Sequence, residues 1–243
     1  MAGTVGERAG VTEHPRRAEE ARIRAAYARR VGAWRYDWSN PAYVFAMQDL
    51  QRRVLATLCR SGLWPLRGKR VLDVGCGTGH WLRLLIGWGA EPRRVVGVDL
   101  LRDRLAHATE LAPRRMVLSC GNAATLAFRN ASFDLVLQFT VFTSILDPDL
   151  RRCVADEMVR VLKPDGTILW YDFCVDNPHN PDVRAVKAAE IARLFPACAA
   201  HLRRVTLAPP LTRWLAPRSW TLCALLNAVH PLRTHYLGVI KRR

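Results

Sequence analysis

The sequence predicts an α/β fold in which the strands of a parallel sheet alternate with helices. Two observations support this prediction. Short apolar or β-branched runs alternate with stretches of helical spacing, and the first run leads through closely spaced glycines into an apolar helix. The predicted strands are 71–74, 95–99, 116–120, 133–139 and 167–173, and helices are expected at 42–60, 102–110, 149–162 and 183–195. Such alternation favours parallel strands joined by right-handed crossovers.

The central stretch of the chain is VLDVGCGTGHW, Val71 to Trp81. An apolar strand ends in a turn with glycine at positions 75, 77 and 79. Glycine adopts backbone angles that other residues avoid, and its lack of a side chain lets a ligand approach the backbone amides. The first amides of the following helix have no partner within that helix. The stretch therefore predicts a turn that binds a nucleotide-like ligand.

The glycine spacing distinguishes between nucleotide cofactors. A dinucleotide fingerprint, G-x-G-x-x-G, would need glycine at position 80, which is His80. Asp73 followed by G-x-G-x-G instead resembles the first motif of class I S-adenosylmethionine-dependent methyltransferases. A second strand ends at Asp99, about 20 residues past the glycines, where an acidic residue can accept both ribose hydroxyls.

Two later segments extend this resemblance. Ser132–Val136, SFDLV, is similar to the start of the fourth strand in these enzymes, and Arg160–Gly166, RVLKPDG, is similar to the segment that leads into their fifth strand, with Asp165 in place of a glycine. The resemblance implies a Rossmann-like, seven-stranded, mostly parallel sheet with helices on both faces. Runs at 202–207 and 236–240 would supply the remaining strands, the last one antiparallel.

The resemblance also implies S-adenosylmethionine as cofactor and S-adenosylhomocysteine as product. The residues expected to bind the cofactor are Asp73, Gly75, Cys76, Gly77, Gly79, Asp99, Leu100, Asn122, Ala123, Gln138 and Phe139. Asn122 stands where the family commonly has an acidic residue that receives the adenine amino group. Its amide oxygen can accept the same hydrogen bond. At Cys76 any small residue would fit between the glycines.

A general base is needed only if the methyl acceptor arrives protonated, because the rest of the catalysis is positioning and desolvation. Asp172, at the end of the fifth strand, and His179, in the loop that follows, are the candidate bases. Each has an alternative interpretation as a turn or surface residue. His80 is expected to be an early helix residue, and the sequence predicts no metal site.

The chain is expected to have three parts. Residues 1–15 are predicted to be disordered, 16–66 to form a helical N-terminal extension, and 67–243 to form the cofactor-binding domain with an insertion at about 208–234. The extension could fold over the cofactor as a lid or pack onto the core, and the insertion could cover the active site or pack as a helix. Candidate acceptor-binding residues are Tyr27, Tyr36, Tyr43 and Trp214.

The chain is strongly basic, with a net charge of +16 and 37 Lys and Arg residues. From His201 onward there are eight basic residues and no acidic one. A basic face toward RNA, an anionic substrate or anionic lipid would fit, and so would a solvated arginine-rich surface. The N-P-P-Y type signature of nucleobase amino methylation is absent after the fourth strand, where Gln138–Val141 reads QFTV.

Seven scattered cysteines without a C-x-x-C pair indicate free thiols in a reducing compartment, so we expect a cytoplasmic protein. No stretch is long and apolar enough for a membrane span, although peripheral membrane contact stays open. The sequence as a whole predicts methyl transfer to a small molecule, hydrophobic or lipid-linked, in specialised or cell-envelope biosynthesis, with O, N or C as acceptor atom. The alternatives are an RNA methyltransferase and a non-catalytic protein of this fold. The sequence does not indicate the oligomeric state.

Overall fold

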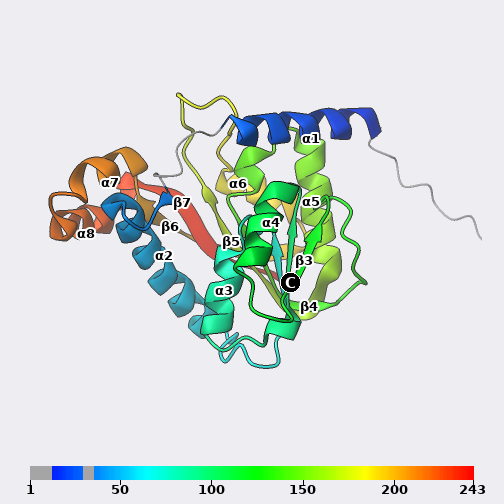
Figure 1. Ribbon diagram of the computed structural model, residues 1–243. Helices are drawn as coiled ribbons and strands as arrows, with labels where there is room; N and C mark the ends of the chain where they lie inside the picture. The colour runs from blue at the N-terminus through cyan, green and yellow to red at the C-terminus, as the bar shows by residue number, and fades with distance from the viewer. Residues whose placement is uncertain (1–12, 30–35) are drawn as a thin grey trace, which may run out of the picture.

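The computed structural model describes residues 13–29 and 36–243, which are built around one seven-stranded sheet (Figure 1). The strand order is β3-β2-β1-β4-β5-β7-β6. The strands are β1 (Val71–Val74), β2 (Val95–Asp99), β3 (Val117–Cys120), β4 (Phe133–Phe139), β5 (Leu162–Phe173), β6 (Cys198–Leu207) and β7 (Arg233–Arg242). β1 to β5 pair in parallel, and β7 lies antiparallel between β5 and β6. The predicted Rossmann-like α/β fold is confirmed.

Helices cover both faces of the sheet, as Figure 1 shows. They are α1 (Glu13–Ala28), α2 (Pro41–Arg60), α3 (His80–Gly87), α4 (Arg102–Glu110), α5 (Pro148–Val161), α6 (Ala188–Leu194), α7 (Pro209–Leu215) and α8 (Trp220–Ala228). Alternate residues of each strand enter opposite cores. Val71 packs with α2 and α3 on one face, whereas its neighbour Leu72 packs with α5 and α6 on the other. Burial on both faces explains why the central strands are continuously apolar.

Several element boundaries differ from the sequence prediction. α1 begins at Glu13, three residues before the predicted start at Arg16. Residues 1–12 and 30–35 lie outside the described part of the chain, and the first of these ranges contains most of the stretch that was predicted to be disordered. β5 begins at Leu162, five residues before the predicted start, because it pairs with Phe133 ahead of a register shift. The helix expected from Val183 begins only at Ala188, since the Val186 amide pairs with the Phe173 carbonyl.

The insertion forms α7 and α8, which lie beside α2 at the β6 edge of the molecule (Figure 1). A small apolar cluster joins them, formed by Ala42, Leu207, Leu215, Ala216 and Cys223. Asn227 on α8 also donates to Asp49 on α2, at 2.9 Å. The insertion therefore packs as helices against α2 and β6.

Three further findings concern only residues 13–29 and 36–243. Within these ranges, no helix has the length and apolar character needed to cross a membrane. They contain no group of three potential metal-ligating side chains placed to hold an ion. All seven cysteines fall in the second range and are unpaired there.

Candidate cofactor site

The glycine turn between β1 and α3 adopts a backbone that favours glycine at three positions. The φ angles of Gly75, Gly77 and Gly79 are +73°, +55° and +72°. The Gly75 and Cys76 amides both donate to the Val98 carbonyl, at 2.7 and 3.0 Å, which ties the turn to the end of β2. Gly79 is the N-cap of α3, and His80 is its first residue, as predicted. The turn is thus held by backbone bonds at the carboxyl edge of the sheet.

Side chains from other elements lie against two of these glycines. A Cβ atom at Gly75 would come 2.5 Å from Cγ2 of Val141, which follows β4. A Cβ at Gly77 would come 2.6 Å from the Arg104 guanidinium on α4. At Gly75 the Val141 side chain blocks a larger residue, whereas at Gly77 the flexible Arg104 side chain would have to move. The turn has the features of a cradle that a ligand approaches through the backbone.

Asp99 connects the glycine turn to the end of β2. Its buried carboxylate accepts the Gly77 amide at 2.7 Å through Oδ2 and the Leu101 amide at 2.8 Å through Oδ1. A carboxylate oxygen has two acceptor sites, so each oxygen can take one further hydrogen bond. This chemistry fits a ligand that presents two neighbouring hydroxyl groups.

Asp73 is a buried carboxylate directly before the turn. It is 2% exposed, and no hydrogen bond from a described residue reaches its carboxylate. Burial, with the negative charge of Asp99 added, raises the pKa of Asp73 well above its usual range. A cationic or hydrogen-bond-donating group would relieve this cost. The glycine cradle, Asp99 and Asp73 together fit S-adenosylmethionine, which carries a ribose diol and two positive charges besides its carboxylate.

The residues predicted after β2 and β3 also lie at this edge. Leu100 and Ala123 are partly buried against the core. The Asn122 amide nitrogen donates to Glu20 of α1 at 2.5 Å, and its oxygen accepts the Ala124 amide at 2.8 Å. Asn122 therefore joins the end of β3 to α1, and its predicted contact with adenine stays a prediction.

Three predicted residues have side chains that point into the protein. Gln138 is fully buried and accepts the Val141 amide at 3.3 Å, so it shapes the turn that brings Val141 to Gly75. Phe139 packs edge-on against Trp81, with ring centroids 4.4 Å apart. Cys76 lies in the same core, where burial raises the pKa of its thiol. Because its side chain is buried in this core, Cys76 can contact a cofactor only through its backbone.

The two candidate bases occupy very different surroundings. Asp172 is fully buried; its carboxylate accepts the Thr143 hydroxyl and amide and the Phe173 amide. Burial raises its pKa to about 6 in spite of these hydrogen bonds. His179 is exposed in the loop after β5, with its amide donating to Asn177. Asp172 positions the segment after β4, and the base role of either residue stays a prediction.

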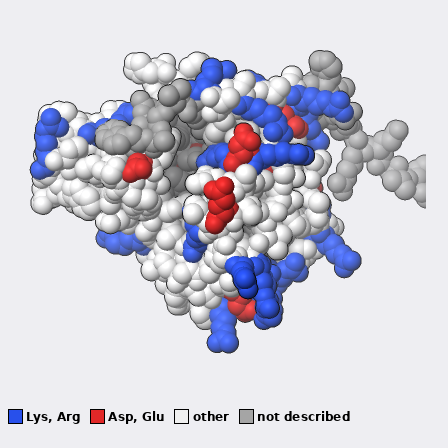
Figure 2. Space-filling view, in the orientation of Figure 1, with Lys and Arg blue, Asp and Glu red and all other residues white. Residues whose placement is uncertain are grey.

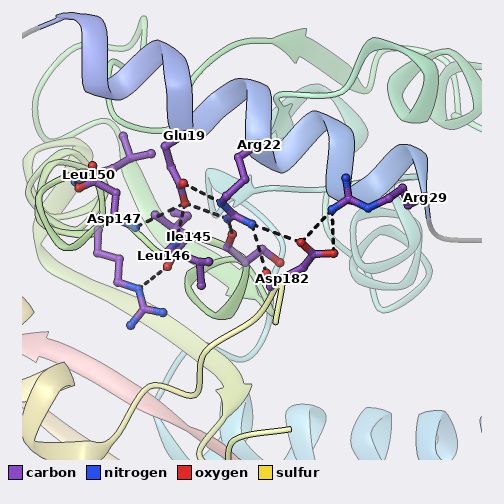
Figure 3. Close-up of polar contacts among 10 residues, drawn as sticks. Glu19, Arg22, Arg29, Ile145, Leu146, Asp147, Leu150 and Asp182 are labelled. Atoms are coloured by element: carbon purple, nitrogen blue, oxygen red, sulfur yellow. Dashed lines mark hydrogen bonds and ion pairs between the residues drawn. The ribbon is translucent and has the colours of Figure 1, made fainter. Parts of the chain in front are cut away.

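Helix α1 lies across the ends of the strands and is held there by charged side chains (Figure 3). Glu19 accepts the Leu146 amide at 2.6 Å and pairs with Arg22 at 2.7 Å. Arg22 also donates to the Ser144 carbonyl at 2.6 Å, and Arg29 pairs with Asp182 at 2.9 Å. The partners follow β4 and β5, so α1 covers the same edge that holds the glycine turn.

The predicted acceptor-binding residues are divided between this cover and the surface. On α1, Tyr27 approaches the Ser144 hydroxyl at 3.3 Å and lies under the Arg104 guanidinium, 5.2 Å from its ring centroid. Tyr43 is partly buried and contacts Tyr36, which is 67% exposed. Trp214 is 62% exposed on α7, with Arg218 stacked on it. Tyr27 therefore lies near the glycine turn, through its contact with Arg104, whereas Trp214 lies on the surface of α7.

A pocket of about 480 Å³ opens between the start of α2 and the insertion. It is lined by Trp38, Ser39, Pro41, Val44, Ala216, Pro217, Arg218, Ser219 and Trp220. The Trp38 ring lies 5.9 Å from the His80 ring, and His80 directly follows the glycine turn. The pocket is therefore next to the candidate cofactor site and largely apolar. Sequence reasoning missed Trp38 and Trp220 as lining residues, although the aromatic stretch before α2 was a signal for the first.

Comparisons with known proteins agree with this geometry. A family model described as a methyltransferase domain matches residues 71–166, from the start of β1 to the turn within β5. Residues 71–166 form a methyltransferase domain. The motifs within it resemble those of class I, S-adenosylmethionine-dependent methyltransferases.

Relatives of the methyltransferase domain include two named enzymes. The chain is 32% identical over 148 residues to demethylmenaquinone methyltransferase of Lactococcus lactis, covering 59% of this chain and 54% of that protein. It is 29% identical over 182 residues to 27-O-demethylrifamycin SV methyltransferase of Amycolatopsis mediterranei, covering 68% and 64%. The chain thus spans less than two thirds of the length of either relative.

A solved structure supports the fold. The chain superimposes with a TM-score of 0.60 on a putative sarcosine dimethylglycine methyltransferase from Galdieria sulphuraria. The match covers 79% of this chain and 84% of that one at 16% identity. At this identity the likeness concerns the fold.

Proposed function

We propose that the protein transfers a methyl group from S-adenosylmethionine to a hydrophobic small molecule. The observation that carries the proposal is the glycine turn with two buried carboxylates beside it, Asp73 directly before the turn and Asp99 at the end of β2. This donor set suits the cofactor, and the apolar pocket beside it suits an acceptor with a planar or aliphatic part.

The chain's own residues would bind and orient the reactants. Asp99 would hold the ribose hydroxyls, and Asp73 with the Gly75–Gly79 backbone would orient the methionine part. When bound, the cofactor supplies a sulfonium-activated methyl group, whose thioether leaving group needs no acid. Rings at the pocket and the helix α1 would exclude water, so the remaining contribution is alignment of the acceptor atom with the methyl group.

The proposed acceptor class rests on the pocket and on the relatives. Trp38 and Trp220, 51% and 43% exposed, present ring surface to the pocket beside the glycine turn. Two relatives are named for the small molecules demethylmenaquinone and 27-O-demethylrifamycin SV. We extend the proposal to hydrophobic or lipid-linked acceptors of specialised or cell-envelope metabolism, with O, N or C as acceptor atom.

The cofactor part is tested by isothermal titration calorimetry with S-adenosylhomocysteine, S-adenosylmethionine, NAD and NADP. We expect binding of the first two and none of the nicotinamide cofactors, because the third glycine of a dinucleotide turn is replaced by His80. Absence of S-adenosylhomocysteine binding by the folded protein would overturn the proposal.

The acceptor part is tested by transfer of labelled methyl groups to a panel of quinols, phenols and amines. For the best acceptor, Trp38→Ala and Trp220→Ala should raise KM about tenfold, since each removes a large apolar surface from the pocket. Trp64→Ala is the matched control, because Trp64 is 42% exposed, similar to Trp220, and lies outside the pocket lining. An equal effect of all three substitutions would contradict the assignment of this pocket.

A further inference from the structure

A second groove, of about 350 Å³, lies between the C-terminal half of α2 and strands β6 and β7. Six arginines line it: Arg52, Arg53 and Arg60 from α2, Arg203 and Arg204 from β6, and Arg233 at the start of β7. The remaining lining residues are Ala56, Thr57, Val205 and Leu237. The groove is thus lined by guanidinium groups and small or aliphatic side chains.

Asp49 is the carboxylate that partly balances this charge. It accepts Arg53 at 2.6 Å and Arg52 at 2.8 Å. Burial alone would raise the pKa of Asp49, but these two arginines lower it below its usual range. Among the described residues, no Asp or Glu forms an ion pair with Arg60, Arg203, Arg204 or Arg233.

Arg233, at the start of β7, adds a further positive charge to the groove. Its guanidinium donates to the backbone carbonyls of Asn227, at 2.6 Å, and Arg204, at 3.3 Å. Burial lowers the pKa of Arg233, and the positive charge of Arg53 lowers it further. Like charges that share a groove repel one another, so a bound anion would stabilise this arrangement.

The lining chemistry indicates which anion. A guanidinium donates through a planar fork that matches two oxygens of a phosphate, and several forks in one groove suit several phosphate groups. None of the described residues that line the groove is aromatic, although stacking on rings is a main contribution to the binding of single-stranded nucleic acid. The surface as a whole is basic, with Lys and Arg in groups around the face shown in Figure 2, but the groove gathers six arginines at one place.

We propose that this groove binds a cluster of phosphate groups, such as a polyphosphorylated small molecule or a polyphosphorylated lipid headgroup presents. The groove is separate from the acceptor pocket. On α2, Val44 lines the acceptor pocket and Arg52 is the first residue that lines the arginine groove, so the two linings are about 12 Å apart along that helix.

The test measures binding of inorganic tripolyphosphate to the full chain by calorimetry at near-physiological ionic strength. We expect binding in the micromolar range that weakens steeply with added salt. The double variant Arg60→Gln/Arg203→Gln should weaken it at least about tenfold for each arginine removed, because hydrogen bonds between charged groups are lost. Both side chains are exposed and form no ion pair with a described residue, so the fold should be kept.

Arg129→Gln/Arg193→Gln is the matched control, since these arginines are equally exposed and lie on other elements. It carries the same net charge as the groove variant, so equal weakening by both would show general charge attraction and overturn the proposal. Absence of tripolyphosphate binding would overturn it as well. S-adenosylhomocysteine binding is measured in parallel on each variant and should be unchanged, which separates failure of this site from failure of the proposed methyltransferase function.

The source of the phosphates is distinguished in two further arms. Vesicles of phosphatidylcholine with and without phosphatidylinositol bisphosphate test the lipid headgroup; flotation of the parent but not of the groove variant would assign the site to lipid. Binding of tripolyphosphate without flotation would assign it to a soluble ligand. Tighter binding of single-stranded oligouridylate than of tripolyphosphate, with the same dependence on Arg60 and Arg203, would overturn the proposal in favour of RNA.

Discussion

The two layers that enclose the candidate cofactor site are built in contrasting ways. The first layer is the glycine turn, residues 75–79 with Asp99, in which backbone amides bond to a buried carbonyl and a buried carboxylate. The second layer is the α1 cover, in which Glu19, Arg22 and Arg29 bond to segments that follow β4 and β5. Only the turn directly continues a strand of the central sheet, β1.

From this difference we infer that the turn is already formed before the cofactor binds and that α1 can move away from the site. Breaking the turn would leave buried polar groups unpaired, which is costly. The cover is held by the Arg29–Asp182 ion pair, in which Arg29 is 62% exposed, and by hydrogen bonds of Glu19 and Arg22 to loop backbone; its buried apolar contacts are few, chiefly Ile23 and Ala26. We therefore expect cofactor exchange to require opening of α1 and no change in the sheet.

The largest effect is expected from Asp99→Ala, which removes two backbone contacts of the turn together with the proposed ribose contact. Affinity for S-adenosylhomocysteine should fall about 100-fold or more, because each hydrogen bond to a charged group contributes roughly 1.5–3 kcal/mol. Calorimetry measures the loss. Asp103→Ala, at an exposed site on α4, should leave the affinity unchanged; an unaltered affinity in Asp99→Ala would contradict the role of this carboxylate.

Gly77→Ala should have the next largest effect on the turn. A side chain is strained at a φ of +55°, and the new Cβ would displace the Arg104 guanidinium. We expect a loss of about 1–2 kcal/mol in the free energy of unfolding and roughly tenfold weaker cofactor binding. Gly87→Ala, where no atom lies within 4 Å, is the control and should be neutral or stabilising. Equal denaturation midpoints for the two variants would show that the turn tolerates a side chain.

The pH dependence should differ between the buried sheet end and the cover. The folded-state pKa of Asp172, about 6, lies above its unfolded value of 3.8, so its contribution to stability should increase as the pH falls from 6 toward 4. The free energy of unfolding of the parent, relative to Asp172→Asn, should rise by up to about 1.4 kcal/mol per pH unit in this window. Denaturant titrations at several pH values measure this difference, and a difference independent of pH would contradict the raised pKa.

The pKa of Glu19, in the cover, is shifted in the opposite direction from that of Asp172. Burial raises its pKa, but the hydrogen bonds from Arg22 and Leu146 outweigh that effect and lower it below 4.5. Its contribution is therefore present above pH 4.5 and lost as the pH falls through the folded-state value. The protection factors of the amides in 13–28, which compare the exchange rate with the intrinsic rate at each pH, should then fall on acidification, while those in β1 should not.

The smallest effects are expected from single substitutions in the cover at neutral pH. Glu19→Gln should accelerate amide exchange in α1 up to about tenfold, because the Leu146 amide and Arg22 lose a charged acceptor. Arg29→Ala should change it less than about threefold, since Arg29 is 62% exposed in its pair with Asp182. Glu110→Gln, on the exposed side of α4, is the control. Slowed exchange or an unchanged rate in Glu19→Gln would show that the cover is held in another way.

The sequence by itself determined the unit from β1 to β2. The apolar runs, the three glycines and Asp99 lie within 29 residues, and their geometry depends on local backbone preferences and hydrogen bonds between neighbouring segments. The seven-stranded sheet and its antiparallel last strand, β7, were also predictable, through the family resemblance, because they accompany these motifs.

The tertiary structure decided which distant side chains meet. Leu146 is more than 120 residues away from Glu19 in sequence, and so is Asp182 from Arg29. Asp172 is enclosed because Thr143 from another connection bonds to it. The arginine groove likewise combines α2 with strands near the C-terminus. Such contacts depend on how the elements pack and on loop lengths, and no local pattern in the sequence records them.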